Sequence, residues 1–315
     1  MKYRQYLGIL LGALYGLAYR FLCENYVSDD LYNYSIYSIS FIWVLPIVIG
    51  IIPILFAREE IIKFWWKQFV FPVLSVLLFF LLALSSGLED MLCILVIALP
   101  FLLAAGIVGL VVGQIIKRRK SKHLYSILLL PLLLNPIESL LPDQRETFEV
   151  ETSITIDTPN AIVWNNLVEV PEISEDEFDY GFFNFIGVPR PIKSALKTIN
   201  GKEYRIGYFT GGLKLYESIS QLDSLKFVNF KIHIDQSELR DLPTDKHLLN
   251  SHYFNFENIS YQTQVLNDGQ TKLILHCDYI IDSKMNGYAN FWASKIVKDF
   301  EVRLLKSLKK KIENQ

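Results

Sequence analysis

Histidine is the residue type best suited to metal binding or proton transfer, and this sequence contains five. They are His123, His233, His247, His252 and His276. None has a metal-binding spacing such as His-x-x-x-His with a carboxylate partner. Gly-x-Ser-x-Gly, P-loop and dinucleotide-binding motifs are also missing, and Gly211-Gly212 is typical of a hairpin turn. The sequence therefore predicts no metal and no cofactor, and it identifies no catalytic residue.

An acidic run at residues 172–179 is the densest group of carboxylates in the chain. Paired carboxylates perform acid–base chemistry only where partial burial separates their pKa values. We expect this run to form a solvated turn instead. The aromatic residues that follow it could pack a helix, cover a cavity as an apolar lid, or dip into a bilayer; they are Tyr180, Phe182, Phe183 and Phe185.

Four polar residues in the second half of the chain could contact the head group of a ligand: Arg205, Glu217, His233 and Tyr253. They fall in segments with the alternating pattern of β-strands, and spacing alone does not tell which of them point inward.

The elements that carry these residues belong to a chain with two unlike halves. Residues 1–142 are mostly apolar and contain 11 basic and 8 acidic residues, whereas residues 143–315 contain 20 and 25. Neither half is basic enough to predict a nucleic-acid partner. The three cysteines have no metal or disulfide spacing. We predict a transmembrane helical domain at 1–142 and a globular domain at 143–315.

The first half contains four apolar runs long enough, at about 20 residues each, to cross a bilayer. They cover residues 6–22, 36–57, 69–86 and 91–116. Basic residues precede the first run, separate the second from the third and follow the fourth, while the other loops are acidic. The positive-inside rule then predicts a cytoplasmic amino terminus in an integral membrane protein, of the kind found in a bacterial cell membrane.

A fifth apolar segment, residues 124–141, determines on which side of the membrane the globular domain lies. Its apolar core, Leu124–Leu134, would cover only about 16 Å as a helix. Glu138 could sit at the membrane interface, and basic residues before the segment and acidic ones after it favour an outward crossing. We predict five spans with the globular domain outside. The alternative is a re-entrant or interfacial helix that leaves the domain in the cytoplasm.

Small residues recur at four-residue spacing in the first run, at Gly8, Gly12 and Gly16. Such faces let helices approach closely, either within one bundle, which we favour, or between copies in a homo-oligomer. The interiors of the first four spans hold no acidic or basic side chain, which disfavours a coupled transporter or pump. The bundle is expected to act as an anchor.

In the second half, the pattern predicts a strand at Phe148–Ile156 and short helices near residues 159–167 and 178–186. Further strands are expected at 204–210, 213–220, 225–234, 253–265 and 271–281, with Asn267-Asp268-Gly269 as a hairpin turn. An amphipathic helix at residues 286–311 ends the chain.

This order resembles the SRPBCC superfamily, which includes START lipid-binding domains and polyketide cyclases. The segments that carry the resemblance are SITIDTPNAIVWNNLVEVPEI (153–173), FIGVPRPIK (185–193), GYFTGGLKLYESI (207–219) and YANFWASKIVKDFEVRLLKSLKK (288–310). The resemblance covers about 165 residues. It implies an α+β helix-grip fold, in which a curved antiparallel sheet wraps around the long terminal helix and encloses an apolar pocket.

Aromatic residues are dense in this half and could either line that pocket or pack a core. The resemblance favours the pocket for part of the helix stripe. The predicted cavity residues are Trp164, Phe185, Phe209, Tyr216, Phe230, Phe291, Trp292, Ile296 and Phe300.

Three functions remain open at this point. The favoured one is a membrane-anchored domain that binds a hydrophobic small molecule or lipid, with the bilayer as its partner. The second is an enzyme of the cyclase, dehydratase or hydrolase kind, which requires groups with perturbed pKa values in the pocket. The third is a regulatory protein-interaction domain with an exposed apolar patch.

Overall fold

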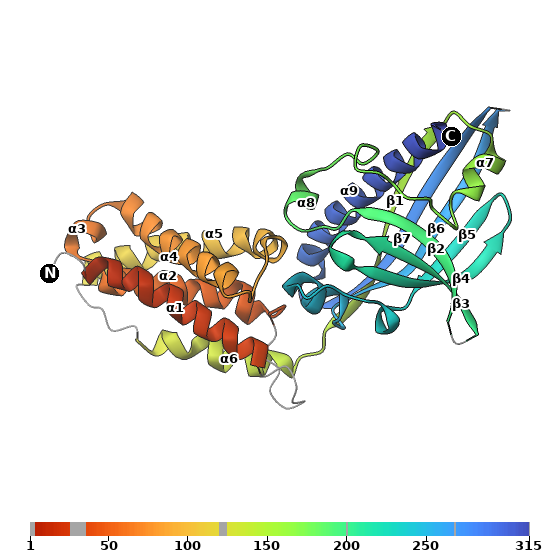
Figure 1. Ribbon diagram of the computed structural model, residues 1–315. Helices are drawn as coiled ribbons and strands as arrows, with labels where there is room; N and C mark the ends of the chain where they lie inside the picture. The colour runs from red at the N-terminus through yellow and green to blue at the C-terminus, as the bar shows by residue number, and fades with distance from the viewer. Residues whose placement is uncertain (1–3, 26–35, 120–124, 200, 268, 315) are drawn as a thin grey trace. The chain divides into compact units, whose positions relative to one another are not determined.

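The computed structural model describes the chain except residues 1–3, 26–35, 120–124, 200, 268 and 315 (Figure 1). The chain divides into two compact units, residues 1–143 and residues 144–315. Each unit is described by itself below.

The regular elements of the first unit are all helices among its described residues. Its elements are α1 (Arg4–Asn25), the π-helical turn η1 (Ser40–Val44), α2 (Leu45–Phe56), α3 (Glu59–Ile62), α4 (Trp65–Ser85), α5 (Met91–Arg119), the 3-10 helix η2 (Tyr125–Leu129) and α6 (Leu130–Ser139). By length and composition, three helical segments could cross a membrane: Tyr6–Cys23, Trp65–Ser85 and Met91–Arg118. Two further apolar helices are shorter, at Ser40–Phe56 and Ile127–Glu138.

The glycine face of α1 packs against other helices of the same chain. A methyl group added at Gly8 would lie 2.8 Å from Cβ of Phe56 in α2, and one at Gly16 would lie 2.6 Å from Cδ1 of Ile49. A methyl group added at Gly12 would lie closer still to the hydroxyl oxygen of Ser75 in α4. Close packing within the bundle, the reading favoured from the sequence, therefore accounts for these glycines.

Two buried acidic residues join the helical elements. Arg20, near the end of the first apolar run, is 0% exposed, and its Nε lies 2.5 Å from Oε1 of Glu89. Glu138 of α6 accepts hydrogen bonds from the backbone N–H groups of Ile39 and Ser40, at 2.6 and 2.9 Å. Its carboxylate thus satisfies donors left free at the start of the Ser40–Phe56 helix.

The second unit is built on one seven-stranded antiparallel sheet, in the order β1-β7-β6-β5-β4-β3-β2. The strands are β1 (Gln144–Ile156), β2 (Pro191–Ile199), β3 (Lys202–Phe209), β4 (Lys214–Asp223), β5 (Phe227–Ile232), β6 (Phe254–Asn267) and β7 (Gln270–Ser283). Its helices are α7 (Asn160–Asn165), α8 (Phe182–Phe185) and α9 (Asn286–Glu313), with short helical turns η3 (Thr210–Gly212), η4 (Ile234–Gln236) and η5 (Asp245–Leu249).

The long helix α9 lies along the curved sheet (Figure 1) and packs against β1 and β7. The predicted α+β class and helix-grip architecture are therefore confirmed. The predicted hairpin is also present, because β6 and β7 pair as far as Asn267 and Gln270. The face of the sheet that packs against α9 is called the inner face below.

One strand, β2, was missed from the sequence. It lies at an edge and pairs only with β3, so it needs no continuous apolar pattern. Lysines 193 and 197 and Ser194 interrupt the alternation that identified the other strands.

The main core of this unit lies where the carboxy-terminal half of α9 meets the inner face. Leu305, Leu308 and Ile312 of α9 pack there against strand residues and against α7. The strand and α7 members include Ile156, Trp164, Phe230, Tyr261, Leu273 and Leu275. Burying such side chains contributes about 1.5–3 kcal/mol each, so this half of α9 is fixed firmly to the sheet.

Candidate functional site

The amino-terminal half of α9 covers the inner face less completely. Six apolar side chains of the inner face and of α9 are partly exposed, and we call them the inner group: Phe209, Ile219, Phe256, Ile259, Val297 and Phe300. The rings of Phe209 in β3 and Phe300 in α9 have centroids 6.1 Å apart. Ile259 and Phe256 pack against the clusters around Cys277 and around Leu215. These side chains are therefore covered less fully than those of the main core.

A single carboxyl group, that of Glu301, lies in the sheet-facing stripe of α9. Val297 precedes it by one turn and Leu305 follows by one turn. Glu301 is 2% exposed, and its Oε2 accepts a hydrogen bond of 2.6 Å from the hydroxyl of Thr152 in β1. Its other oxygen, Oε1, is buried and has no hydrogen-bond partner. A buried acceptor without a partner costs about 1–3 kcal/mol.

The surroundings of Glu301 favour its protonated form. Burial raises the pKa of Glu301 to about 7, although the Thr152 hydroxyl and the Lys298 ammonium act in the opposite direction. Burial raises the pKa of the Cys277 thiol, and a charge on Glu301 raises it further. Burial likewise raises the pKa of Tyr279 to about 12. Neither neighbour in β7 therefore provides an anion at neutral pH.

Arg205 and Glu217, two of the predicted polar residues, form a buried ion pair across β3 and β4. They are 7% and 5% exposed. Arg205 also donates from Nε to the carbonyl of Val168 at 2.7 Å, and its guanidinium lies 4.6 Å from the centroid of Phe230. Its donors are thus used in tying the chain after α7 to the sheet, a structural role.

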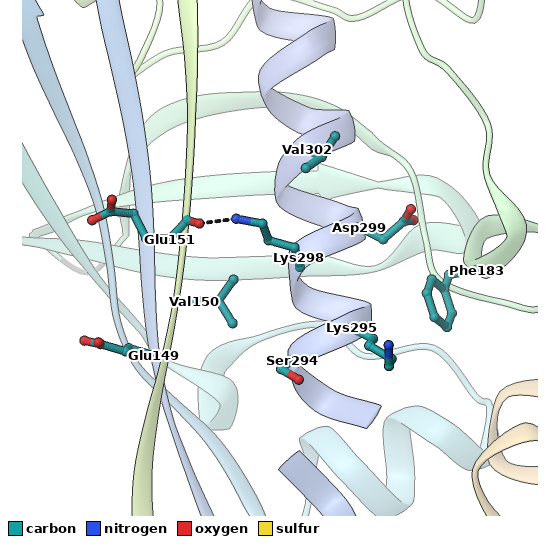
Figure 2. Close-up of a pocket in the computed structure, with 9 residues that line it drawn as sticks. All are labelled: Glu149, Val150, Glu151, Phe183, Ser294, Lys295, Lys298, Asp299 and Val302. Carbon is teal, nitrogen blue, oxygen red and sulfur yellow. Dashed lines mark hydrogen bonds between the residues drawn. The ribbon is translucent and has the colours of Figure 1, made fainter. Parts of the chain in front are cut away.

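An open groove of about 820 Å³ runs along the flank of α9 that faces the free edge of β1. Figure 2 shows Val150 pointing from β1 toward α9, while the side chains of Glu149 and Glu151 point away. Ser294, Lys295, Lys298, Asp299 and Val302 line it from α9, and Phe183 of α8 lies at its other side. Lys298 donates a hydrogen bond to the backbone carbonyl of Glu151, so a lysine protects this sheet edge. None of the predicted cavity residues lines this groove.

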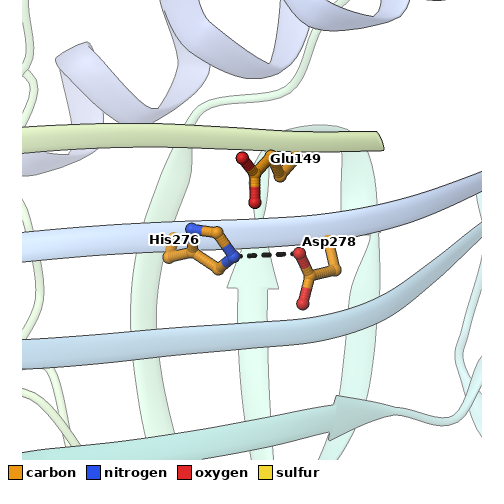
Figure 3. A group of neighbouring side chains, drawn as sticks. All are labelled: Glu149, His276 and Asp278. Atoms are coloured by element: carbon orange, nitrogen blue, oxygen red, sulfur yellow. Dashed lines mark hydrogen bonds and ion pairs between the residues drawn. The ribbon is translucent and has the colours of Figure 1, made fainter. Parts of the chain in front are cut away.

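On the outer face of the sheet, Glu149, His276 and Asp278 come together (Figure 3). One ligand atom from each lies within 4.8 Å of the others, close enough to hold a metal ion. Glu149 and Asp278 are directly opposed in the β1–β7 register, and like charges opposed in this way are destabilising. His276 Nε2 lies 2.9 Å from Asp278 Oδ1. The hydrogen bond between His276 and Asp278 therefore accounts for the close approach of these three exposed or partly exposed side chains.

The structure distributes the predicted cavity residues over several environments. Phe209, Ile296 and Phe300 are partly buried, and the first and last are in ring contact. Trp164 and Phe230 are buried in the main core. Phe185 and Phe291 are 80% and 50% exposed.

The two remaining members of that set also lie away from the inner group. Tyr216 points to the outer face, opposite to its neighbours Leu215 and Glu217, and its hydroxyl donates to Glu238 at 3.2 Å. Trp292 is partly buried, and its ring packs against that of Phe291.

Two predicted polar residues are likewise separate from the inner group. His233 bonds the Ser218 hydroxyl at 2.8 Å on the outer face. The ring of Tyr253, which precedes β6, has its centroid 3.9 Å from that of the His252 ring.

Glu301 was not predicted as a site residue, although the sequence contains one signal for it. Glu301 is an acidic residue within an otherwise mainly apolar helical stripe.

No family model matches this chain, and no curated protein matches it either. Several solved structures do. The Zhui aromatase/cyclase from Streptomyces sp. R1128 is 15% identical, with 54% of this chain and 95% of that one covered, at a TM-score of 0.36. Norcoclaurine synthase from Thalictrum flavum is 10% identical over 54% and 97%, at 0.34. A conserved protein from Geobacillus kaustophilus is 11% identical over 53% and 96%, also at 0.34.

Proposed function

We propose that this protein is anchored in a membrane by its helical unit and binds a hydrophobic small molecule or lipid at the inner face of its sheet. The inner group is the observation that carries this proposal. Four of its side chains come from the inner face of the sheet and two from α9, yet all six are partly exposed. An apolar ligand would remove this surface from water, which is favourable by about 25 cal/mol for each Å².

Two features support exchange of such a ligand with a bilayer. Three helical segments are long and apolar enough to cross a membrane, and only residues 140–143 separate α6 from β1. In addition, aromatic side chains are exposed around α8, where Tyr180, Phe182 and Phe185 are 47%, 58% and 80% exposed. Clustered aromatic groups of this kind favour a membrane interface.

Native mass spectrometry of the full chain, released from mild detergent, tests the proposal. Wild-type protein is expected to carry an apolar adduct that exchanges with added lipid. Ala293→Leu adds bulk beside Val297 and should lower the bound fraction several-fold, because Ala293 packs toward the inner face. The same change at Ala161, which is exposed on α7, is the matched control. A wild-type protein without any exchangeable adduct would contradict ligand binding, and equal occupancy in Ala293→Leu would contradict the inner face as its site.

One observation favours a second function, catalysis on a hydrophobic substrate. Glu301 has a pKa raised by burial to about 7, the range in which a carboxyl group works as a general acid or base. Acid–base mechanisms commonly pair such a group with another whose pKa is shifted the other way. Cys277 and Tyr279, whose pKa values both rise, do not meet that requirement. Binding is therefore the better supported function.

A further inference from the structure

Glu301 is buried, and the fold provides a hydrogen-bond partner for only one of its two carboxylate oxygens. Thr152 satisfies one carboxylate oxygen, while Oε1 has no partner although the residue is 2% exposed. A polar contact between β7 and α9 is complete by comparison, since the Tyr279 hydroxyl donates to Asn290 at 2.7 Å. An incomplete group beside a complete one points to a partner that is not part of this chain.

The position of Glu301 places that oxygen near the proposed ligand. On a helix surface, side chains three and four residues apart are neighbours. Val297 precedes Glu301 by four residues and Leu304 follows by three, and both remain partly exposed. A ligand that covers Val297 would therefore lie beside the Glu301 side chain. A modest movement of Val297 and Leu304 would bring the ligand and Oε1 into contact.

We propose that Glu301 is the polar anchor of the ligand site, and that the ligand is a mainly apolar molecule with a hydroxyl group that bonds Oε1. This inference rests on the proposed binding function. A hydroxyl group both donates and accepts hydrogen bonds. It can thus pair with Glu301 as a carboxylate or as a carboxylic acid, whereas an ammonium group pairs only with the carboxylate.

Titration calorimetry on the full chain in lipid nanodiscs, with empty nanodiscs subtracted, provides the test. The probes are 2-naphthol and 2-methoxynaphthalene, which share a ring system and differ in the hydroxyl donor. At pH 8, where Glu301 is mainly ionised, wild-type protein should bind 2-naphthol about tenfold more tightly, the ratio expected for one hydrogen bond to a charged group. Glu301→Leu should reduce that ratio to about one, and Glu301→Gln, which keeps the shape and one acceptor, should give an intermediate value.

Glu149→Gln is the matched control, because this carboxylate is exposed on the outer face; the wild-type ratio should persist in it. Circular dichroism should show that each variant keeps its sheet. Equal affinity of the two probes for wild-type protein, or an unchanged ratio in Glu301→Leu, would overturn the anchor role while leaving ligand binding intact. If neither probe binds, the proposed function fails and this inference fails with it.

Discussion

At the scale of the residue, Glu301 makes the stability of the fold depend on pH. Burial raises its pKa from 4.5 to about 7, so the folded state keeps a proton that the unfolded state releases. The contribution of this bound proton to the free energy of unfolding is complete below about pH 4.5 and is lost as the pH rises through about 7. The loss is about 3 kcal/mol at most. Glu301→Gln should therefore unfold at a higher temperature than wild type at pH 8, and the difference should shrink toward pH 5.

The thermal midpoints of wild type and Glu301→Gln across this pH range provide the measurement. The groups that surround Glu301 are Lys298, Glu151, Cys277, Tyr279 and Tyr261. Burial keeps the last three protonated at these pH values, so their own titration should not produce the trend. Glu149→Gln on the outer face should follow the wild-type profile. A parallel pH dependence in Glu301→Gln and wild type would show that Glu301 is already ionised in the fold.

At the scale of the element, the Arg205–Glu217 pair joins β3, β4 and the segment after α7. Arg205→Met would leave the Glu217 carboxylate buried without its partner, because both residues are at most 7% exposed. Removing one member of a buried pair costs about 3–5 kcal/mol, whereas replacing both members by apolar residues costs much less. The double variant Arg205→Met, Glu217→Leu should therefore be more stable than either single variant.

Hydrogen exchange of the β3 and β4 amides measures these differences within the full chain. Lys226 and Asp223 form an exposed pair with 3.9 Å between charged atoms, and Lys226→Met should change protection by less than about 1 kcal/mol. If the double variant lost as much protection as the two single variants together, Arg205 and Glu217 would not be a coupled pair.

At the scale of the whole molecule, helix length bears on the side of the membrane where residues 144–315 lie. The ten residues of α6 extend over about 15 Å, half the thickness of a hydrocarbon core. The sequence predicted five crossings, and by length and composition three described helical segments could cross. We propose that Ser40–Phe56 crosses as a fourth segment and that α6 does not, since Tyr19 and Glu138 hold α6 against the bundle. A green fluorescent reporter fused after Gln315 is then expected to fluoresce in the cytoplasm. A periplasmic phosphatase reporter that is active at the same position would restore the five-crossing topology.

Features that depend on neighbours along the chain could be predicted from the sequence. A run such as Met91–Ile116 is apolar whatever surrounds it, and alternation in β6 and β7 with an Asn-Asp-Gly turn encodes a hairpin locally. Together with the resemblance, this was enough for the helix-grip architecture and for most of its strands. The edge strand β2 was not predicted, because neither of its faces is buried as fully as in a central strand.

Contacts between side chains that are distant in the sequence could not be predicted in this way. Thr152 and Glu301 are 149 positions apart, and their contact depends on how α9 is seated on β1. The register of β3 against β4 turns Arg205 and Glu217 inward together while it turns Tyr216 outward. A shift of one residue would reverse all three. Contacts of this kind arise from pairing and packing between segments that are distant in the sequence, and the periodicity within one segment does not predict them.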